Sequence, residues 1–200
     1  MHELPFDETI LSRVLATRPR RELSADGMGR AAVLVPLFWR EGVLHVLFTK
    51  RTDTVSTHKG QISFPGGRVE PGDPSLLHTA LRESHEEIGL APEHVRVVGA
   101  LDDTVTLRAM RITPYVGLIP DPYPFNLQED EVAYLIDVPL AYFLDPGRLR
   151  VEQMPHPDGV VRPVYFYSIG EEVIWGATAR IVKEWLDAML SPFDKPQSQA

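Results

Sequence analysis

Apolar residues follow two different rhythms along this 200-residue chain, and each rhythm predicts a different element. Spacings of three and four residues predict a helix over 7–18 and a second amphipathic helix over 177–190. Runs rich in β-branched and aromatic residues predict strands instead. These runs span residues 31–39, 43–51, 94–103, 111–120, 131–140, 149–154 and 161–169.

Turn residues join some of these strands into hairpins. Glu41-Gly42 separates the first two strands, and Pro157-Asp158-Gly159 separates the last two, so each pair is expected to be antiparallel. Pro36 lies inside the first strand. Because proline cannot donate a ladder hydrogen bond, it predicts a sheet edge or a bulge at that point.

The order of these elements predicts an α+β fold in one piece. No internal repeat or long linker divides the chain, so residues 1–200 are expected to form a single domain. An N-terminal helix and loop would occupy residues 1–25. The proline-containing polar segment 191–200 is expected to be a disordered tail.

Charge and composition exclude several classes of protein. The chain has 28 acidic and 20 basic residues, a formal net charge of −8, which disfavours binding to nucleic acids and to anionic membranes. It has no cysteine, so disulfides and thiolate metal sites are excluded. The N-terminal MHELPFDE does not resemble a signal peptide, and no apolar run approaches the roughly 20 residues of a membrane span. A cytoplasmic location is therefore expected.

A third helix is predicted just after residue 73. Asp73 is the expected N-cap, Pro74 the first helical residue and Gly89 the stop signal. One face of this helix can pack on a sheet. That face carries Leu77, Ala80, Leu81, Ser84 and Ile88.

The same helix gathers acids on a second face, at Glu83, Glu86 and Glu87. Like charges at this spacing cost roughly 0.2–0.5 kcal/mol per pair. Two interpretations explain the cluster. It is a solvated face balanced by Arg82, or it binds a hard divalent cation such as Mg²⁺ or Mn²⁺ through oxygen ligands. The Gly66-Gly67 turn upstream would allow the backbone to approach a ligand closely.

This stretch resembles the Nudix box, G-x5-E-x7-R-E-U-x-E-E-x-G-U, in which U is a bulky aliphatic residue. Two departures stand out: Asp73 replaces the first glutamate and is separated from Arg82 by eight residues instead of seven, and Ser84 replaces the aliphatic residue. The matching residues are Gly67, Arg82, Glu83, Glu86, Glu87, Gly89 and Leu90.

The resemblance implies an α/β/α sandwich with a mixed β-sheet and a Mg²⁺- or Mn²⁺-dependent hydrolase. Its substrate would be a nucleoside diphosphate linked to another group. By this resemblance Glu83 and Glu87 are metal ligands, Glu86 is a ligand or holds the metal-bound water, and the Gly67 carbonyl completes the set. Arg82 would belong to the catalytic group with Glu86, and would pair with Asp73.

A second signature upstream resembles that of the coenzyme A pyrophosphatase branch, L-L-T-x-R-[SA]-x3-R-x3-G-x3-F-P-G-G. Its second arginine is replaced here by Ser56, which leaves the substrate open between coenzyme A and ADP-ribose or another nucleoside diphosphate derivative. The matches are Leu47, Thr49, Arg51, Gly60, Phe64, Pro65, Gly66 and Gly67. Candidate substrate contacts are Arg51, His58, Lys59, Gln61 and Arg68.

A general base is expected from the acidic loop before the strand at 131–140. Glu131 is the chosen candidate over Glu129 and Asp130, and a merely solvated acidic loop is the alternative. A Nudix-fold nucleotide-binding regulator without activity is a further alternative, although the complete acidic set disfavours it. The expected partner is a small molecule, and a homodimer is left open.

Overall fold

The computed structural model describes residues 8–24, 27–53, 60–106, 109–155 and 159–190. Its helices are α1 (Glu8–Thr17), α2 (Leu76–Ile88) and α3 (Gly176–Leu190), with short 3-10 turns at Pro92–His94, Leu140–Leu144 and Pro146–Arg148. The first strands are β1 (Gly29–Arg40), β2 (Val43–Arg51), β3 (Ile62–Ser63), β4 (Gly66–Arg68), β5 (Arg96–Ala100) and β6 (Thr104–Val105). The others are β7 (Met110–Leu118), β8 (Val132–Pro139), β9 (Leu149–Pro155), β10 (Val161–Ile169) and β11 (Glu172–Trp175).

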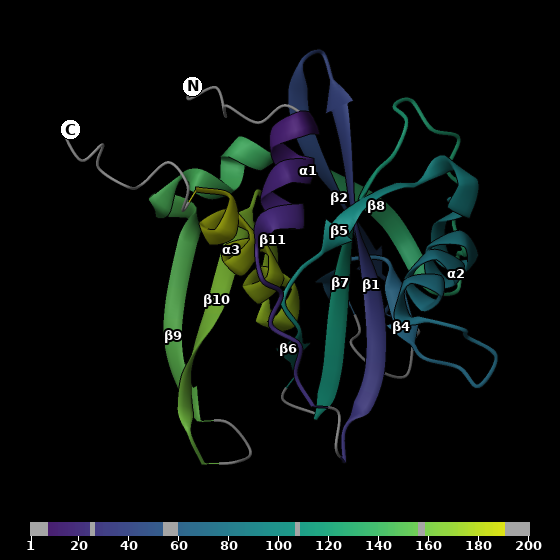
Figure 1. The fold of residues 1–200 in the computed structure, drawn as a ribbon. Helices are drawn as coiled ribbons and strands as arrows, with labels where there is room; N and C mark the ends of the chain where they lie inside the picture. Colours follow the sequence, from purple (N-terminus) through teal and green to yellow (C-terminus); the bar gives the residue numbers. More distant parts are fainter. Residues whose placement is uncertain (1–7, 25–26, 54–59, 107–108, 156–158, 191–200) are drawn as a thin grey trace, which may run out of the picture.

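The strands form two sheets. The larger has the order β3-β2-β1-β7-β5, with β4 on β1, β6 on β7 and β8 on β2. Strands β1 and β7 are parallel while the other pairs are antiparallel, so this sheet is mixed. The smaller sheet has the order β11-β10-β9. Figure 1 shows α2 on one side of the large sheet and α1 and α3 on the other, which confirms the predicted α+β sandwich.

Each side of the large sheet has its own apolar cluster. Under α2, Ile88 and Leu90 pack with Leu34, Phe38 and Leu47 of the sheet. On the opposite side, residues of α1 and α3 form the larger cluster with strands of both sheets. This cluster includes Leu11, Leu15, Val35, Phe48, Tyr167, Ile174, Trp185 and Met189. The helices are therefore held by burial of one apolar stripe each.

Both predicted hairpins form. The β1–β2 turn places Glu41 at φ 51° and Gly42 at φ 78°, the positive values that a tight two-residue hairpin requires. Strands β9 and β10 pair antiparallel. The predicted turn residues Pro157 and Asp158 and the predicted tail 191–200 lie outside the described residues.

The expectation that Pro36 marks an edge or a bulge is wrong. Strand β1 is interior, between β2 and β7, and its ladders run without a register shift. On its other side β1 changes partner: Ala31–Val33 pair with β4, and Leu37–Arg40 pair with β2. Pro36 lies between the two paired segments, where a missing donor costs no ladder bond.

The segment after α1 is fixed to the sheet by a buried carboxylate. Asp103 is fully buried, and it accepts hydrogen bonds from Arg20 Nη2 at 2.7 Å, Thr113 Oγ1 at 2.7 Å and the Leu23 N–H at 3.0 Å. Burial alone would raise the pKa of Asp103, but these hydrogen bonds outweigh it and lower the pKa.

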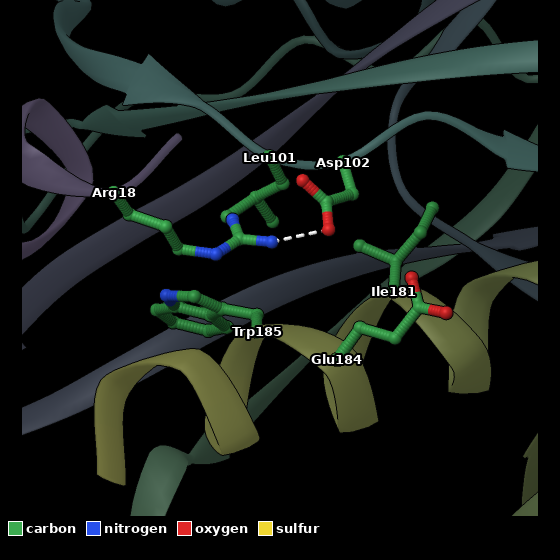
Figure 2. A pocket seen from close by; sticks show the side chains of 6 residues that line it. All are labelled: Arg18, Leu101, Asp102, Ile181, Glu184 and Trp185. Carbon is green, nitrogen blue, oxygen red and sulfur yellow. Dashed lines mark ion pairs between the residues drawn. The ribbon is translucent and has the colours of Figure 1, made fainter. Parts of the chain in front are cut away.

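A second contact joins the same segment to α3. Figure 2 shows Arg18 beside the Trp185 ring and paired with Asp102. Glu184 and Ile181 of α3 complete this depression. Trp185 is buried, and burial raises the pKa of Glu184. The depression contains no residue of the predicted box, and its Arg18–Asp102 ion pair joins the segment after α1 to the segment after β5.

Replacing Asp103 by asparagine should remove a buried charge from between Arg20 and Arg111. Breaking a buried pair by losing one partner costs about 3 kcal/mol or more in the free energy of unfolding. Urea unfolding at neutral pH should show that loss in Asp103→Asn. The exposed ion-pair variant Asp187→Asn should change stability by no more than about 0.5 kcal/mol.

The stability that Asp103 contributes to the fold depends on pH. Because the folded-state pKa of Asp103 is lowered from 3.8, its stabilisation is present above that value and lost as pH falls through the folded-state pKa. The stability difference between wild type and Asp103→Asn should therefore narrow in acid. A difference that is equal at pH 7 and at the acid limit of folding contradicts this assignment.

Candidate active site

The acidic helix α2 begins two residues later than predicted. Its N-cap is Ser75, whose hydroxyl accepts the His78 N–H at 3.1 Å. The prediction of Asp73 as N-cap is wrong because its carboxylate is engaged by another group. The stop at Gly89 is confirmed: φ is 68°, and the Gly89 N–H bonds the His85 carbonyl at 2.9 Å.

Asp73 binds Arg82 instead of capping the helix. Its carboxylate accepts Arg82 Nε at 3.0 Å and Nη2 at 3.1 Å. It also accepts Thr79 Oγ1 at 2.8 Å and the Glu70 N–H at 2.9 Å. The Arg82 guanidinium, followed by the Glu70 N–H, holds the pKa of Asp73 well below its usual range. The predicted Asp73–Arg82 pair therefore forms, despite the extra residue between them.

Arg82 also binds two of the helix acids. Its Nη1 donates to Glu86 Oε2 at 2.9 Å and its Nη2 to Glu83 Oε1 at 3.0 Å. Nη2 further donates to the Arg68 carbonyl at 3.2 Å. The hydrogen bond to Asp73 raises the pKa of Arg82, so this residue is a permanent cation. The mutual repulsion of the helix acids is thus offset within the helix itself.

Glu83 lies directly against Gly67 of β4. A methyl group at Gly67 would come within 2.3 Å of the Glu83 carboxyl carbon and 2.4 Å of Oε1. Only glycine permits this approach. Burial raises the pKa of Glu83, and the Arg82 guanidinium opposes that shift. Gly67 and Glu83, both predicted as ligands of the cation, therefore lie next to each other.

Glu87 is the most buried of the helix acids, at 5% exposure. Its Oε2 accepts the Gly66 N–H at 3.1 Å, and its Oε1 lies 3.4 Å from Arg51 Nη1. Burial raises the pKa of Glu87 to about 8, against the effects of the Gly66 N–H and Arg51. Burial thus favours the neutral form of Glu87, and a cation bound beside it would favour the charged form.

Arg51 connects the two sequence signatures. Besides Glu87, it approaches the exposed carboxylate of Glu131, with Nη2 at 3.7 Å from Oε2. Its backbone N–H donates to the Gln61 carbonyl at 2.9 Å. The loop carrying Glu131 is attached to α2, because the Gln128 N–H donates to the Glu87 carbonyl at 2.9 Å. Glu131 thus borders the acidic face.

The remaining predicted residues divide into two groups. Arg68 lies on β4 beside the helix, and its carbonyl binds Arg82. His58, Lys59 and Ser56 lie outside the described residues. Sequence reasoning missed Thr79 and His78 as partners of Asp73, and it did not foresee that Arg51 contacts Glu87.

The acids suit a hard cation in their chemistry, but they hold guanidinium groups in this arrangement. Carboxylate and carbonyl oxygens are the ligands that Mg²⁺ and Mn²⁺ prefer. Within the described parts of the chain, no three histidine, aspartate or glutamate side chains form a ready metal site. Glu83 and Glu86 contact Arg82, and Glu87 contacts Arg51. A bound cation would therefore have to exchange with these contacts.

A cavity of about 170 Å³ lies on the same side of the sheet as α2. Leu47 lines it and lies four residues from Arg51 on β2, about 13 Å along the strand. Both side chains lie on the face that packs against α2, because Leu47 belongs to the apolar cluster under that helix and Arg51 contacts Glu87. The other lining residues are Phe38, Arg40, Ile119, Pro120, Asp121, Phe125, Leu135 and Asp137.

The described helices include none that is long and apolar enough to cross a membrane.

The fold is similar to a crystal structure of a MutT/nudix family protein from Enterococcus faecalis, with a TM-score of 0.52 and 14% identity. That similarity covers 97% of this chain and 72% of the other.

Sequence comparison carries the family assignment. A protein of Cronobacter sakazakii named "Uncharacterized Nudix hydrolase NudL" is 38% identical over 177 residues, 88% of this chain and 91% of that protein. A protein of the same name from an Enterobacter species is 36% identical over 186 residues, 92% of this chain and 94% of that protein. The profile of the NUDIX domain matches residues 28–152. The chain therefore belongs to the Nudix hydrolase family, whose members act on phosphoric anhydrides.

Proposed function

We propose that this Nudix hydrolase splits the diphosphate of coenzyme A or its thioesters, with Mg²⁺ or Mn²⁺, into 3′,5′-ADP and a 4′-phosphopantetheine product. One observation carries the proposal. Arg51, from the signature that resembles the coenzyme A branch, contacts Glu87 of the box at 3.4 Å. The signature residue therefore belongs to the same site as the acids that would act on the diphosphate.

Glu83, Glu86, Glu87 and the Gly67 carbonyl are the proposed cation ligands. A cation bound there would polarise the phosphoryl oxygens and lower the pKa of water. The burial of Glu87 supports this assignment, since a carboxyl of raised pKa gains charge when a cation binds. Before a cation binds, Arg82 orients Glu83 and Glu86 through its bonds to both.

Glu131 is the proposed general base. Its carboxylate is half exposed, so water can reach it, and Arg51 lies between it and Glu87. A carboxylate in this position can accept a proton from water. Arg51 would also attract the diphosphate to the end of β2.

Substrate recognition is assigned to Arg51, Gln61 and Arg68 among the described residues. His58 and Lys59 stay predictions. A coenzyme A enzyme must bind the 3′-phosphate, for which a cation is the natural partner. Ser56 occupies the signature position where an arginine is expected, which favours ADP-ribose or another nucleoside diphosphate derivative as the second candidate. We also propose that residues 1–200 form a single domain and that the protein is located in the cytoplasm.

A panel of substrates separates these candidates. With Mg²⁺, kcat/KM should be highest for coenzyme A and about tenfold or more lower for dephospho-coenzyme A, the equivalent of one charged hydrogen bond. Product release measured by chromatography gives both values, with ADP-ribose as the third substrate. Equal values for the two coenzyme A forms, and a far higher value for ADP-ribose, would promote the second candidate. No hydrolysis of any of them would indicate a binding protein.

The two adjacent glycines give a matched pair of variants for the cation site. Gly67→Ala places a methyl group against the end of the flexible Glu83 side chain, which can move away. The fold should survive, while the Mg²⁺-dependent rate should fall about 10²-fold because a proposed ligand is displaced. Activity assays and thermal unfolding measure the two effects separately.

Gly66→Ala, in contrast, should destabilise the fold. Its methyl group would meet backbone atoms, the Ala32 carbonyl oxygen at 2.4 Å and Val33 Cα at 2.6 Å, at a φ of 150°. Backbone atoms cannot move away cheaply, so the melting temperature should fall. Full Mg²⁺-dependent activity in Gly67→Ala would remove Glu83 from the proposed ligands.

A further inference from the structure

Strand β9 is an edge of the small sheet. Among the described strands it pairs with β10 alone. Figure 1 shows β9 along the flank of the molecule, on the side away from the large sheet. The opposite edge is covered, because Glu172 of β11 bonds Lys50 and Tyr134 of the large sheet. Exposed edges are commonly blocked by charged residues, proline or a bulge. In β9 the proline is Pro155, at the end of the strand, and the charges are Arg150 and Glu152, which have opposite signs; the β9–β10 ladder has no bulge.

The open backbone groups of β9 can be identified from Pro163. This residue faces Gln153 in the β9–β10 ladder, has no N–H, and gives its carbonyl to Arg180 Nη2 at 3.2 Å. The backbone carbonyl of Pro163 thus points away from β9. In an antiparallel ladder, two facing residues either bond each other or both direct their N–H and carbonyl groups away from the partner strand. Gln153 therefore directs its N–H and carbonyl to the open edge, and by alternation so does Val151. Leu149 directs its carbonyl to the same edge, while its N–H bonds the Pro146 carbonyl of its own chain.

A second copy of the same edge fits in one register. With a two-fold axis at Val151, Val151 faces the partner's Val151 and Leu149 faces the partner's Gln153. The two Val151 residues then exchange N–H and carbonyl bonds, each Gln153 N–H reaches the partner's Leu149 carbonyl, and Pro155 is not used. A closed two-fold contact of this kind is the commonest form of homodimer.

Charge selects the same register. Arg150 then lies opposite the partner's Glu152, and Glu152 opposite the partner's Arg150, on one face of the sheet. An axis at Arg150 would oppose two arginines, and an axis at Glu152 would oppose two glutamates, which is destabilising. Arg150 is already held on this face, 4.2 Å above the Phe166 ring and in contact with Glu152.

Apolar exposure supports a partner at this edge. Val151 is 47% exposed, although it faces Tyr165 in the ladder and its neighbour Leu149 packs on the core. In the register above, the two Val151 side chains become neighbours across the axis. Their mutual cover removes apolar surface from water.

We propose that two copies of this chain associate through antiparallel pairing of β9 about a two-fold axis at Val151. The small sheets β11-β10-β9 of the two copies then form one continuous sheet. The acidic face of α2 is not part of this contact, so the dimer is independent of the proposed substrate.

Charge reversal gives a sharp test. Arg150→Glu and Glu152→Arg each place like charges opposite one another in both symmetry-related pairs. Sedimentation equilibrium should show a dimer of twice 22.5 kDa for wild type, and a dissociation constant raised at least about tenfold in each variant. An equimolar mixture of the two variants restores complementary pairs, and native mass spectrometry should detect the heterodimer with near wild-type affinity.

The mixture separates the contact between copies from the Arg150–Glu152 contact within one chain, because neither variant regains the latter on mixing. Circular dichroism and thermal unfolding establish that each variant is folded. A wild-type protein that stays monomeric overturns the proposal. So does a dimer that neither variant weakens, or a mixture that associates no better than the separate variants.

Discussion

Arg82 is the cation on which the arrangement of the acidic helix depends. Its guanidinium is fixed by Asp73 and reaches Glu83, Glu86 and the Arg68 carbonyl. Without that charge, three glutamates within five residues would repel one another next to a buried sheet. With it, Glu83 is held against Gly67, and the acidic face is ordered before any ligand binds.

Arg51 likewise places a positive charge between acidic side chains, on the other side of this face. It lies between Glu87 and Glu131, which belong to elements far apart in the sequence. Lys50, the next residue to it on β2, bonds Glu172 of the small sheet. The end of β2 therefore joins the acidic face to the small sheet. A preorganised set of charges of this kind is what diphosphate hydrolysis requires.

Much of this arrangement could be predicted from the sequence, because its strongest signals are local. Alternation located the strands, Glu41-Gly42 located a hairpin, and the box spacing located the acids on one helix face. The failures came from long-range contacts. Asp73 was assigned as N-cap because capping is a local rule, but the charge of Arg82 nine residues on competes for it. Pro36 was assigned to an edge or a bulge because no local rule shows that β1 changes partner next to the distant strand β4.

Mn²⁺ binding tests most directly whether the acids of α2 bind a divalent cation. Electron paramagnetic resonance of free Mn²⁺ should show a site in the wild-type protein whose affinity falls about tenfold or more in Glu87→Gln. Glu184→Gln, which alters a carboxyl of raised pKa on α3 away from this face, should bind as wild type does. Equal Mn²⁺ binding in wild type and Glu87→Gln, or none in the wild type, would contradict the account.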